Sequence, residues 1–478
     1  MLALYICLAI LTFLASVVII RAFLFRPEKY SNTPIKAVIF DEKKAVNDLS
    51  EMVKCKTVSN VDKALEDDGE FERFKLLLKE LFPLINSKCE YIDVGSRSIL
   101  YKLDGLSSEN PIVLMSHYDV VSVDGEKWKH PPFSGLITEE AVWGRGTLDT
   151  KGTLNACMQA VETLIEEGFV PEKDIYLAFG GDEEINGHGA SDIVDYFEEH
   201  HIAPSYVLDE GGAVVEGVFP GVKAPCALVG IAEKGIMNVE LVSMSNGGHS
   251  SSPPRFTPLQ KLSRACCKIT KKSFKYKPSV AATALFNTLS PHSSFLYRIL
   301  FANLWLFSPL LSLYTKTVGG EMNALVRTTC AFTQAKGSDG MNVIPTEAKM
   351  VANLRINPGE TTESVIEYLN SVINDSEVKV NMLYGTNPSR VSTTDSDGYK
   401  TIVDAIKGTW EGTLVSPYLM VACSDSRHWG RISDKVYRFS AMALVGAERG
   451  TIHGNNEHIP IDTVKKSVEF YLRLLKQI

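Results

Sequence analysis

The sequence of 478 residues lacks the features that define several protein classes. Its nine cysteines are scattered from Cys7 to Cys423 without a CxxC pair, so they do not resemble a disulfide scaffold. Acidic residues outnumber basic ones, and the net charge of -8 argues against nucleic acid as the main partner. Internal repeats and low-complexity tracts are missing as well. What remains is a globular protein too long for one hydrophobic core. We expect two domains, or one large α/β domain with a second domain inserted into it.

Charge is missing altogether from the first 20 residues, which are rich in Leu, Ile, Val and Ala. As a helix with a rise of ~1.5 Å per residue, this segment would be about 30 Å long, which matches the hydrocarbon core of a bilayer. A cleaved signal peptide is the alternative. Because the segment has no basic start and no clear small-x-small cleavage site, we expect a retained membrane anchor at 1–20.

Two features of the sequence favour opposite orientations of this anchor. Arg21, Arg26 and Lys29 follow the apolar run, and the positive-inside rule would leave the rest of the chain in the cytoplasm. The triplet Asn374–Ser376 fits an N-glycosylation acceptor and favours the lumenal or extracellular side. The residues alone leave the orientation open.

Short apolar runs alternate with helical stretches in the first half of the chain, after a helical scaffold at about 34–90. Strands are predicted at 112–115, 175–179 and 206–208, and helices at 154–165 and 191–197. This alternation predicts an α/β domain with helices on both faces of a mostly parallel sheet. We assign 34–233 and 388–478 to this domain. In open sheets of this kind, ligands bind beyond the carboxyl ends of the strands.

A second unit begins near Lys234. Its predicted strands lie at 239–242, 329–334, 349–356 and 378–383, and its helices at 259–269 and 363–373. We expect an inserted α+β domain at 234–387. An apolar stretch at 295–314 interrupts it. Pro309 and the interior Arg298 disfavour a second membrane span there, so we expect an interfacial helical hairpin or an apolar substrate surface.

Four predicted strand ends or turns carry residue types that bind metals: His117, Asp149, the pair Glu183 and Glu184, and Asp209. Any one of these alone is more simply explained as a helix cap or a solvated carboxylate. Their recurrence at four such places favours a metal site. Glycines lie beside them, and a glycine lets the backbone approach an ion or a substrate closely. Asp149 can offer both of its oxygens and could bridge two ions.

The spacing inside two of these motifs indicates separate roles. His117 and Asp119 lie on one face of an extended segment, where the carboxylate can accept the second ring N–H of the histidine and orient it. The adjacent Glu183 and Glu184 point in different directions. One of them can bind metal while the other faces the attacking water.

The motifs extend over nearly everything after the anchor. They are Met115–Asp119, Trp143–Gly146, Asp149–Gly152, Gly181–Glu184, Leu208–Gly212, Gly247–Ser251, Asn342–Pro345 and Ile452–Glu457. Together they closely resemble the aminoacylase and carboxypeptidase S family of zinc metallopeptidases, and most of all its branch of carboxypeptidase S and the N-fatty-acyl-amino-acid hydrolases. The resemblance implies a zinc-peptidase catalytic domain with a ferredoxin-like lid. It also implies that the catalytic domain faces the lumen or the outside.

The resemblance implies two zinc ions per chain and a ligand set for each. One ion would be held by His117, Asp149 and Asp209, and the other by Asp149, Glu184 and His453. The peptide bond after Asp149 is expected to be cis.

Glu183 would be the catalytic base, which takes a proton from water and later protonates the departing amine. Two alternatives stay open among the ligands. Glu210 could replace Asp209. His458 lies close to His453 in the sequence, but it lacks the neighbouring glycine of the motif and is interpreted as structural.

Four residues resemble substrate contacts of the family: His249, Asn342 and Arg355 in the lid, and Arg427 in the segment 424–428. The planar fork of an arginine binds a carboxylate in a bidentate manner, which predicts a substrate with a free carboxylate next to the scissile amide. The simpler alternatives are a surface salt bridge for Arg355 and a turn cap for His249.

Three functions remain to be compared. The first is hydrolysis, or reversible formation, of N-acyl amino acids with apolar acyl groups, and the second is a carboxypeptidase or dipeptidase that acts on short peptides. The third is an anchored binding protein without activity, which is disfavoured because every expected ligand and base position is filled. The apolar stretch 295–314 favours the first, since it could guide an acyl chain from a bilayer.

Overall fold

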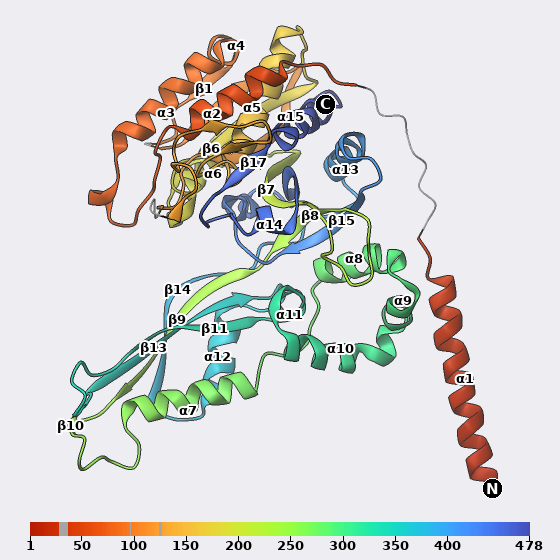
Figure 1. The fold of residues 1–478 in the computed structure, drawn as a ribbon, viewed down its shortest axis with the longest axis vertical. Helices are drawn as coiled ribbons and strands as arrows, with labels where there is room; N and C mark the ends of the chain where they lie inside the picture. The colour runs from red at the N-terminus through yellow and green to blue at the C-terminus, as the bar shows by residue number, and fades with distance from the viewer. Residues whose placement is uncertain (28–36, 96, 124–126) are drawn as a thin grey trace.

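The computed structural model describes residues 1–27, 37–95, 97–123 and 127–478. Lys29 of the basic flank and Pro34 at the start of the predicted helical scaffold lie outside these residues. Two larger sheets, of eight and four strands, organise the described chain (Figure 1). The chain leaves the first sheet after Glu233 and leaves the second after Thr386. The domain boundaries at 234 and 387 stay a prediction.

The eight-stranded sheet has the order β1-β2-β6-β3-β7-β16-β8-β15. Its strands are β1 (Glu90–Ile92), β2 (Ile99–Leu103), β3 (Ser107–His117), β6 (Lys173–Gly180), β7 (Tyr206–Val215), β8 (Cys226–Glu233), β15 (Leu414–Met420) and β16 (Val436–Leu444). Pairing is parallel along β6-β3-β7-β16 and between β8 and β15, and antiparallel at the β1-β2-β6 edge. The apolar runs of β3 and β6 are buried because helices cover both faces of the sheet.

One face of the sheet shares its hydrophobic core with most of the helices, and the other with α6. The first group comprises α2 (Glu42–Val53), α3 (Asp68–Leu81), α4 (Pro83–Lys88), α5 (Lys151–Glu166), α13 (Asp397–Thr409) and α15 (Ile461–Leu475), while α6 is Gly189–Glu199. Almost every residue of α5 is buried, which places it between the sheet and the outer helices. The predicted α/β fold with helices on both faces is confirmed.

The four-stranded sheet is antiparallel, with the order β11-β13-β9-β14. Its elements follow one another as β9 (Gly235–Met244), α7 (Pro258–Lys271), β11 (Thr329–Lys336), β13 (Glu347–Ile356), α12 (Thr362–Ile373) and β14 (Val378–Thr386). Both helices share one core with the sheet. This β-α-β-β-α-β order is that of a ferredoxin-like unit. A two-stranded ladder of β10 (Gly248–His249) and β12 (Val343–Ile344) lies at its far end (Figure 1).

Four helices interrupt the small unit but pack against the core of the large sheet. They are α8 (Val280–Leu289), α9 (Phe295–Phe301), α10 (Leu304–Val318) and α11 (Gly320–Val326). Phe286, Phe301 and Leu311 belong to the same hydrophobic cluster as the strands of the large sheet. The apolar stretch at 295–314 therefore has an inner face that contributes to the first core. Its two helices, α9 and α10, meet at an angle of 102°.

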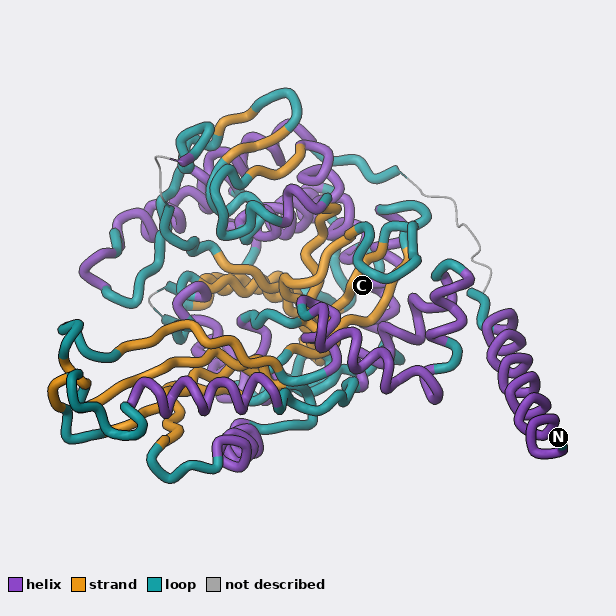
Figure 2. The backbone as a smooth tube through the Cα atoms, turned by 60° about the horizontal axis from the view of Figure 1, so that its bottom comes forward, coloured by secondary structure: helices purple, strands orange, loops and turns teal. Residues whose placement is uncertain are grey.

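The N-terminal apolar segment forms α1 (Leu2–Leu24), which ends four residues beyond the predicted anchor. It is the one described helix long and apolar enough by itself to cross a membrane, and the bent pair α9–α10 passes the same test only if counted as one span. Figure 2 shows α1 projecting away from the strands of both sheets.

Candidate metal centre

Three neighbouring strands of the large sheet bring candidate ligands to one edge. His117 is the last residue of β3, while Glu183 and Glu184 lie in a short 3₁₀ turn directly after β6. Asp209 and Glu210 lie on β7, which pairs with β3 through Leu208. Because β6, β3 and β7 are parallel neighbours, their carboxyl ends meet at the same edge. The strand β7 does not end at Asp209, as the sequence pattern suggested, but continues to Val215.

The other two candidate ligands come from turns beside a small three-stranded sheet. This sheet has the order β17-β5-β4, formed by β4 (Leu136–Ile137), β5 (Ala141–Trp143) and β17 (His458–Pro460). Asp149 lies between β5 and α5, and the peptide bond that follows it is cis, as expected. His453 lies between the short helix α14 (Gly446–Arg449) and β17. Asp149 thus reaches the site from a different sheet than the other carboxylates.

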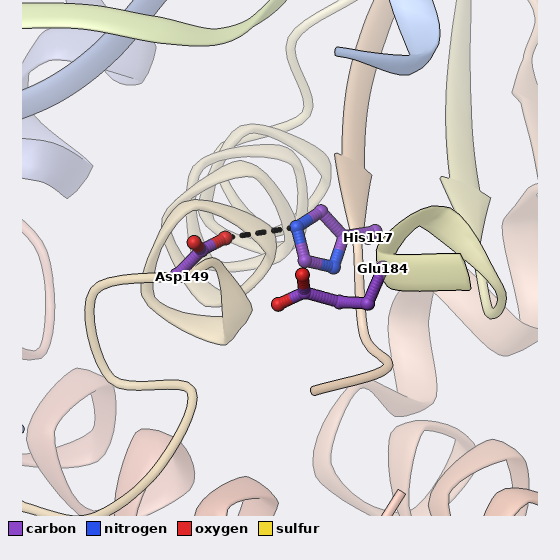
Figure 3. Close-up of side chains that lie close together, drawn as sticks. All are labelled: His117, Asp149 and Glu184. Atoms are coloured by element: carbon purple, nitrogen blue, oxygen red, sulfur yellow. Dashed lines mark hydrogen bonds and ion pairs between the residues drawn. The ribbon is translucent and has the colours of Figure 1, made fainter. Parts of the chain in front are cut away.

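Asp149 lies between two histidines and presents one oxygen to each. Its Oδ1 is 2.9 Å from His117 Nε2, and its Oδ2 is 3.0 Å from His453 Nε2. Glu184 Oε1 lies 3.1 Å from the same His453 nitrogen. Ligand atoms of His117, Asp149 and Glu184 all lie within 4.8 Å of one another (Figure 3). This is the arrangement of a carboxylate that can bridge two ions, with one histidine beside each oxygen.

Asp209 and Glu210 point their carboxylates at different partners. Glu210 Oε1 lies 3.3 Å from His117 Nε2, so it faces the nitrogen that also faces Asp149. Asp209 is buried, and its Oδ2 accepts a hydrogen bond of 2.9 Å from the backbone N–H of Ser426. The Glu210 carboxylate therefore faces His117, whereas the Asp209 carboxylate faces the backbone of the segment 424–428.

Asp119 is fully buried and connects the histidine with the turn after β6. Its Oδ1 lies 3.3 Å from His117 Nδ1, and its backbone carbonyl lies 3.0 Å from the same nitrogen. The two carboxylate oxygens accept the backbone N–H groups of Glu183 and Glu184, each at 3.1 Å, and Oδ2 also accepts the Ser59 hydroxyl at 2.7 Å. The Asp119 carboxylate therefore contributes to the orientation of the His117 ring and fixes the backbone position of Glu183 and Glu184.

Several carboxylates of the site are buried close to one another. Burial raises the pKa of Glu210, assisted by the charge of Asp149, to about 7, and burial raises the pKa of Asp425 to about 8. Burial also raises the pKa of Glu183 well above its usual value. Carboxylates that are crowded in this way are stabilised by a bound divalent cation. The two histidines and the surrounding carboxylates are the donor types that zinc accepts, so the residues fit such an ion.

Arg355 and Arg427 both lie beside Cys423. Arg355 Nη1 is 3.5 Å from the Cys423 Sγ. Burial raises the pKa of that thiol, and the charges of Arg355 and Arg427 oppose the shift. Burial lowers the pKa of Arg427 itself, but Asp425, Glu233 and Glu183 act in the opposite direction and raise it overall. Arg427 therefore lies close to the carboxylates of the site, 3.7 Å from Asp425, and Arg355 lies beside Cys423.

His249 and Asn342 lie elsewhere: His249 is in the two-stranded ladder at the far end of the small unit, and Asn342 directly precedes its second strand (Figure 1). The backbone N–H of Ser250 donates to the Asn342 carbonyl at 2.9 Å, and His249 Nδ1 lies 2.8 Å from the Ser251 hydroxyl. His249 is exposed and takes part in the local turn. Within this chain the structure does not bring these two residues to the metal centre.

Glu457 is a functional candidate that sequence reasoning missed. It is fully buried, and its Oε2 accepts a hydrogen bond of 2.7 Å from Arg145. Its Oε1 accepts the backbone N–H groups of Gly146, Leu148 and Asp149, at 3.0, 2.8 and 3.3 Å. The carboxylate thus holds the turn that presents Asp149. Its position at the end of the Ile452–Glu457 motif was the available signal.

His458 faces away from the ligands. Its ring stacks on Trp143 with a centroid distance of 4.3 Å, and its Nδ1 lies 2.8 Å from the Asn456 carbonyl. These contacts are those of a structural residue of the small sheet.

Comparison with known proteins identifies the family. The profile of Peptidase family M20/M25/M40 matches residues 113–477. The chain is 37% identical to the probable carboxypeptidase S-like 2 of Dictyostelium discoideum, over 90% of this chain and 84% of that protein. It is 34% identical to the N-fatty-acyl-amino acid synthase/hydrolase PM20D1 of Xenopus tropicalis, over 91% of this chain and 86% of that protein.

A solved structure shares the fold described above. The M20 family metallo-carboxypeptidase Sso-CP2 from Sulfolobus solfataricus superposes with a TM-score of 0.66 at 19% identity, over 90% of this chain and 98% of that one. The profile match covers most of the chain, and the two relatives are similar over nearly all of it. The chain therefore belongs to Peptidase family M20/M25/M40, a metal-dependent family, and is a metallopeptidase-type amide hydrolase.

Proposed function

We propose that this protein uses two zinc ions to hydrolyse, or reversibly form, the amide bond of N-acyl amino acids with apolar acyl groups. The observation that carries the proposal is Asp149, with one oxygen beside His117 and the other beside His453. A relative 34% identical over most of both chains is named an N-fatty-acyl-amino acid synthase/hydrolase, which supports this substrate class.

The ligand set that we propose differs in one position from the expectation based on resemblance. His117, Asp149 and Glu210 would hold one ion, and Asp149, Glu184 and His453 the other. Glu210 replaces Asp209 because its carboxylate lies 3.3 Å from His117 Nε2, whereas Asp209 accepts a backbone N–H. Asp119, which contacts His117 through its other ring nitrogen, would fix the tautomer and the orientation of that ligand.

Substitution of the two neighbours on β7 separates these assignments. Glu210→Gln is expected to weaken zinc binding about 10–100-fold or more, by analogy with the losses seen when supporting groups of a metal site are removed. Asp209→Asn keeps an oxygen that can accept the Ser426 N–H, so it should retain both ions. Zinc content after dialysis at a fixed free zinc concentration measures both. The reverse result, with zinc lost only from Asp209→Asn, would restore the original assignment.

Glu183 is proposed to act twice in the reaction. The zinc ions would supply Lewis acidity, which lowers the pKa of water and stabilises negative charge on the substrate carbonyl. Glu183 would take the proton from the attacking water and deliver it to the amine nitrogen as the C–N bond breaks. Its burial and its raised pKa suit a group that must hold a proton between the two steps.

Arg355 and Arg427 are proposed to bind the free carboxylate of the substrate. Both are near Cys423, and the charge of Glu183 helps to raise the pKa of Arg427. A carboxylate held there would lie next to the base and would set the scissile amide beside the metal centre. The role of His249 and Asn342 as substrate contacts stays a proposal. In this chain they lie at the far end of the small unit.

The substrate proposal is tested by comparing two amides that share their carboxyl-terminal residue. We expect a higher kcat/KM for a long-chain N-acyl amino acid than for a blocked dipeptide with the same terminal residue. The carboxyl methyl ester of the acyl substrate is the control, and it should be hydrolysed poorly at the amide because it lacks the charge for the arginines. A strong preference for the dipeptide would support the alternative function instead.

That alternative is a carboxypeptidase or dipeptidase acting on short peptides with a free carboxyl terminus. It is favoured by the relative named probable carboxypeptidase S-like 2, which is 37% identical to this chain. The same metal centre and the same pair of arginines would serve both reactions. The two functions differ only in the group on the other side of the amide.

We propose further that α1 anchors the protein in a membrane, with the catalytic unit on the lumenal or extracellular side. The apolar helix supports the anchor, and Asn374, exposed at the end of α12, supports the side. Glycosidase treatment of the cell-expressed protein should lower its mass, and Asn374→Gln should remove that difference. Cleavage of the catalytic unit by a protease confined to the cytoplasm would contradict the orientation.

A further inference from the structure

The outer surface of α9 and α10 is apolar although it is exposed. Large side chains on it are exposed by 42 to 78% of their surface: Leu296, Tyr297, Trp305, Leu306, Leu310, Leu313, Tyr314 and Val318. Soluble proteins seldom leave a contiguous apolar surface of this kind uncovered, and such surfaces mark interaction sites.

The exposed apolar residues recur along the length of α10 and are not confined to one turn. Leu306, Leu310 and Leu313 recur at helical spacing on the outer face, whereas Leu311 and Thr315 are buried against the core on the inner face. A helix on a water-exposed surface normally carries polar residues on its outer face. A helix that is apolar on both faces fits an environment with protein on one side and lipid on the other.

The helix α1 is fastened to this same surface. Arg21 Nε donates to the Ala302 carbonyl at 3.1 Å, and Asn303 Nδ2 donates to the Val18 carbonyl at 3.0 Å. The rings of Phe23 and Phe295 lie 4.8 Å apart. The remainder of α1 towards the N-terminus is exposed and apolar, and Figure 1 shows it leaving the molecule at the edge formed by α9 and α10.

We propose that the outer face of α9 and α10 lies on the lipid bilayer that α1 enters, and that it delivers acyl chains from that bilayer. The inference rests on the proposed anchor and deepens the proposed substrate class. The occupant is a bilayer because the contacts of Arg21 and Asn303 hold an apolar helix of membrane-spanning length beside the face. Trp305, Tyr297 and Tyr314 are the residue types that concentrate at the level of lipid headgroups.

The bend between α9 and α10 agrees with a helix pair that lies on the membrane. At 102° the two helices cannot continue as one straight span, and the buried Asn303 sits at the break with its amide bonded to α1. The core contacts of Leu311 and Phe301 also hold the inner side of the pair on the protein. A long-chain N-acyl amino acid partitions into a bilayer, so contact between this face and lipid would shorten its route to the enzyme.

The first test uses the fluorescence of Trp305 in the full-length chain reconstituted into phosphatidylcholine vesicles. The chain has five tryptophans and α1 contains none, so Trp305→Phe isolates the signal of the face. Brominated acyl chains should quench a component of the wild-type emission that the variant lacks. Protein that floats with vesicles but shows equal quenching in both forms would overturn the docking face and leave the anchor standing. Protein that does not float would overturn the anchor and the inference together.

The second test measures hydrolysis. Leu310→Asp with Leu313→Asp should raise the apparent KM for a long-chain N-acyl amino acid in vesicles several-fold, with kcat for a soluble N-acetyl amino acid unchanged. The matched control is Leu76→Asp with Leu106→Asp, which lie outside this face, are at least as exposed as Leu310 and should leave both values unchanged. Equal KM changes in the two pairs would refute the inference. So would wild-type self-association that buries Trp305 and is abolished by the Leu310 and Leu313 pair.

Discussion

Glu183→Gln is expected to lower kcat by about 10²–10⁴-fold, the usual contribution of a positioned general acid–base group, or by more because the residue serves in both proton transfers. The amide keeps the size of the side chain and cannot accept the proton. The backbone N–H of Glu183, which donates to Asp119, is unaffected by the change. Steady-state kinetics with an N-acyl amino acid measures the loss.

Zinc content distinguishes this result from damage to the site. Glu183→Gln should retain both ions, whereas the neighbouring Glu184→Gln should lose zinc, because Glu184 Oε1 lies 3.1 Å from His453 Nε2. Activity of Glu183→Gln within a few-fold of the wild type would remove Glu183 from its proposed role. Zinc loss from both variants would mean that the two glutamates do not have separate functions.

Glu457→Ala is expected to destabilise the protein by about 3–5 kcal/mol, since it leaves the guanidinium of Arg145 buried without its carboxylate. Three backbone N–H groups of the Asp149 turn lose their acceptor at the same time. The turn should then hold Asp149 less firmly, and zinc affinity should fall together with stability. The first unfolding transition in urea, monitored with and without added zinc, measures both effects.

Two further variants test whether the loss of the buried carboxylate causes the destabilisation. Glu457→Gln keeps one acceptor oxygen and should lose less stability than the alanine variant, although the charge that faces Arg145 is gone. Glu411→Ala removes an exposed carboxylate and should change the unfolding free energy by less than about 0.5 kcal/mol. If Glu457→Ala matched Glu411→Ala, the buried carboxylate would not hold the turn.

The parts of the fold that could be predicted are those with long periodic segments. The buried runs in β3 and β6 and the helical pattern of α5 follow directly from residues 112–115, 175–179 and 154–165. In contrast, β5 and β17 have three residues each, too few to show any period, so the sheet that positions Asp149 was not predicted. The packing of α8 to α11 on the large core also depends on contacts that no local pattern contains.

The candidate site also has a part that the sequence predicted and a part that it did not. The residue types and their places after predicted strands or turns predicted His117, Asp149, Glu183, Glu184 and Asp209 as a group. The structure brings the first four of them together. The choice between Asp209 and Glu210 could not be made from spacing, because adjacent residues on an irregular strand can exchange directions. Register with β16 shifts just after Asp209, which makes β7 such a strand. The proposed choice of Glu210 therefore rests on the contacts of the two carboxylates, which no local pattern contains.

The single carboxylate of Asp119 makes the two halves of the reaction centre mechanically dependent on each other. Its Oδ1 lies beside His117 and accepts the backbone N–H of Glu183, and its Oδ2 accepts the backbone N–H of Glu184. A structural change at the end of β3 would therefore displace the turn after β6. The effects of substitutions in the two places on the free energy of unfolding would not be additive. A mutation at the end of β3 that improves metal affinity would therefore also shift Glu183, the proposed base, in the turn after β6.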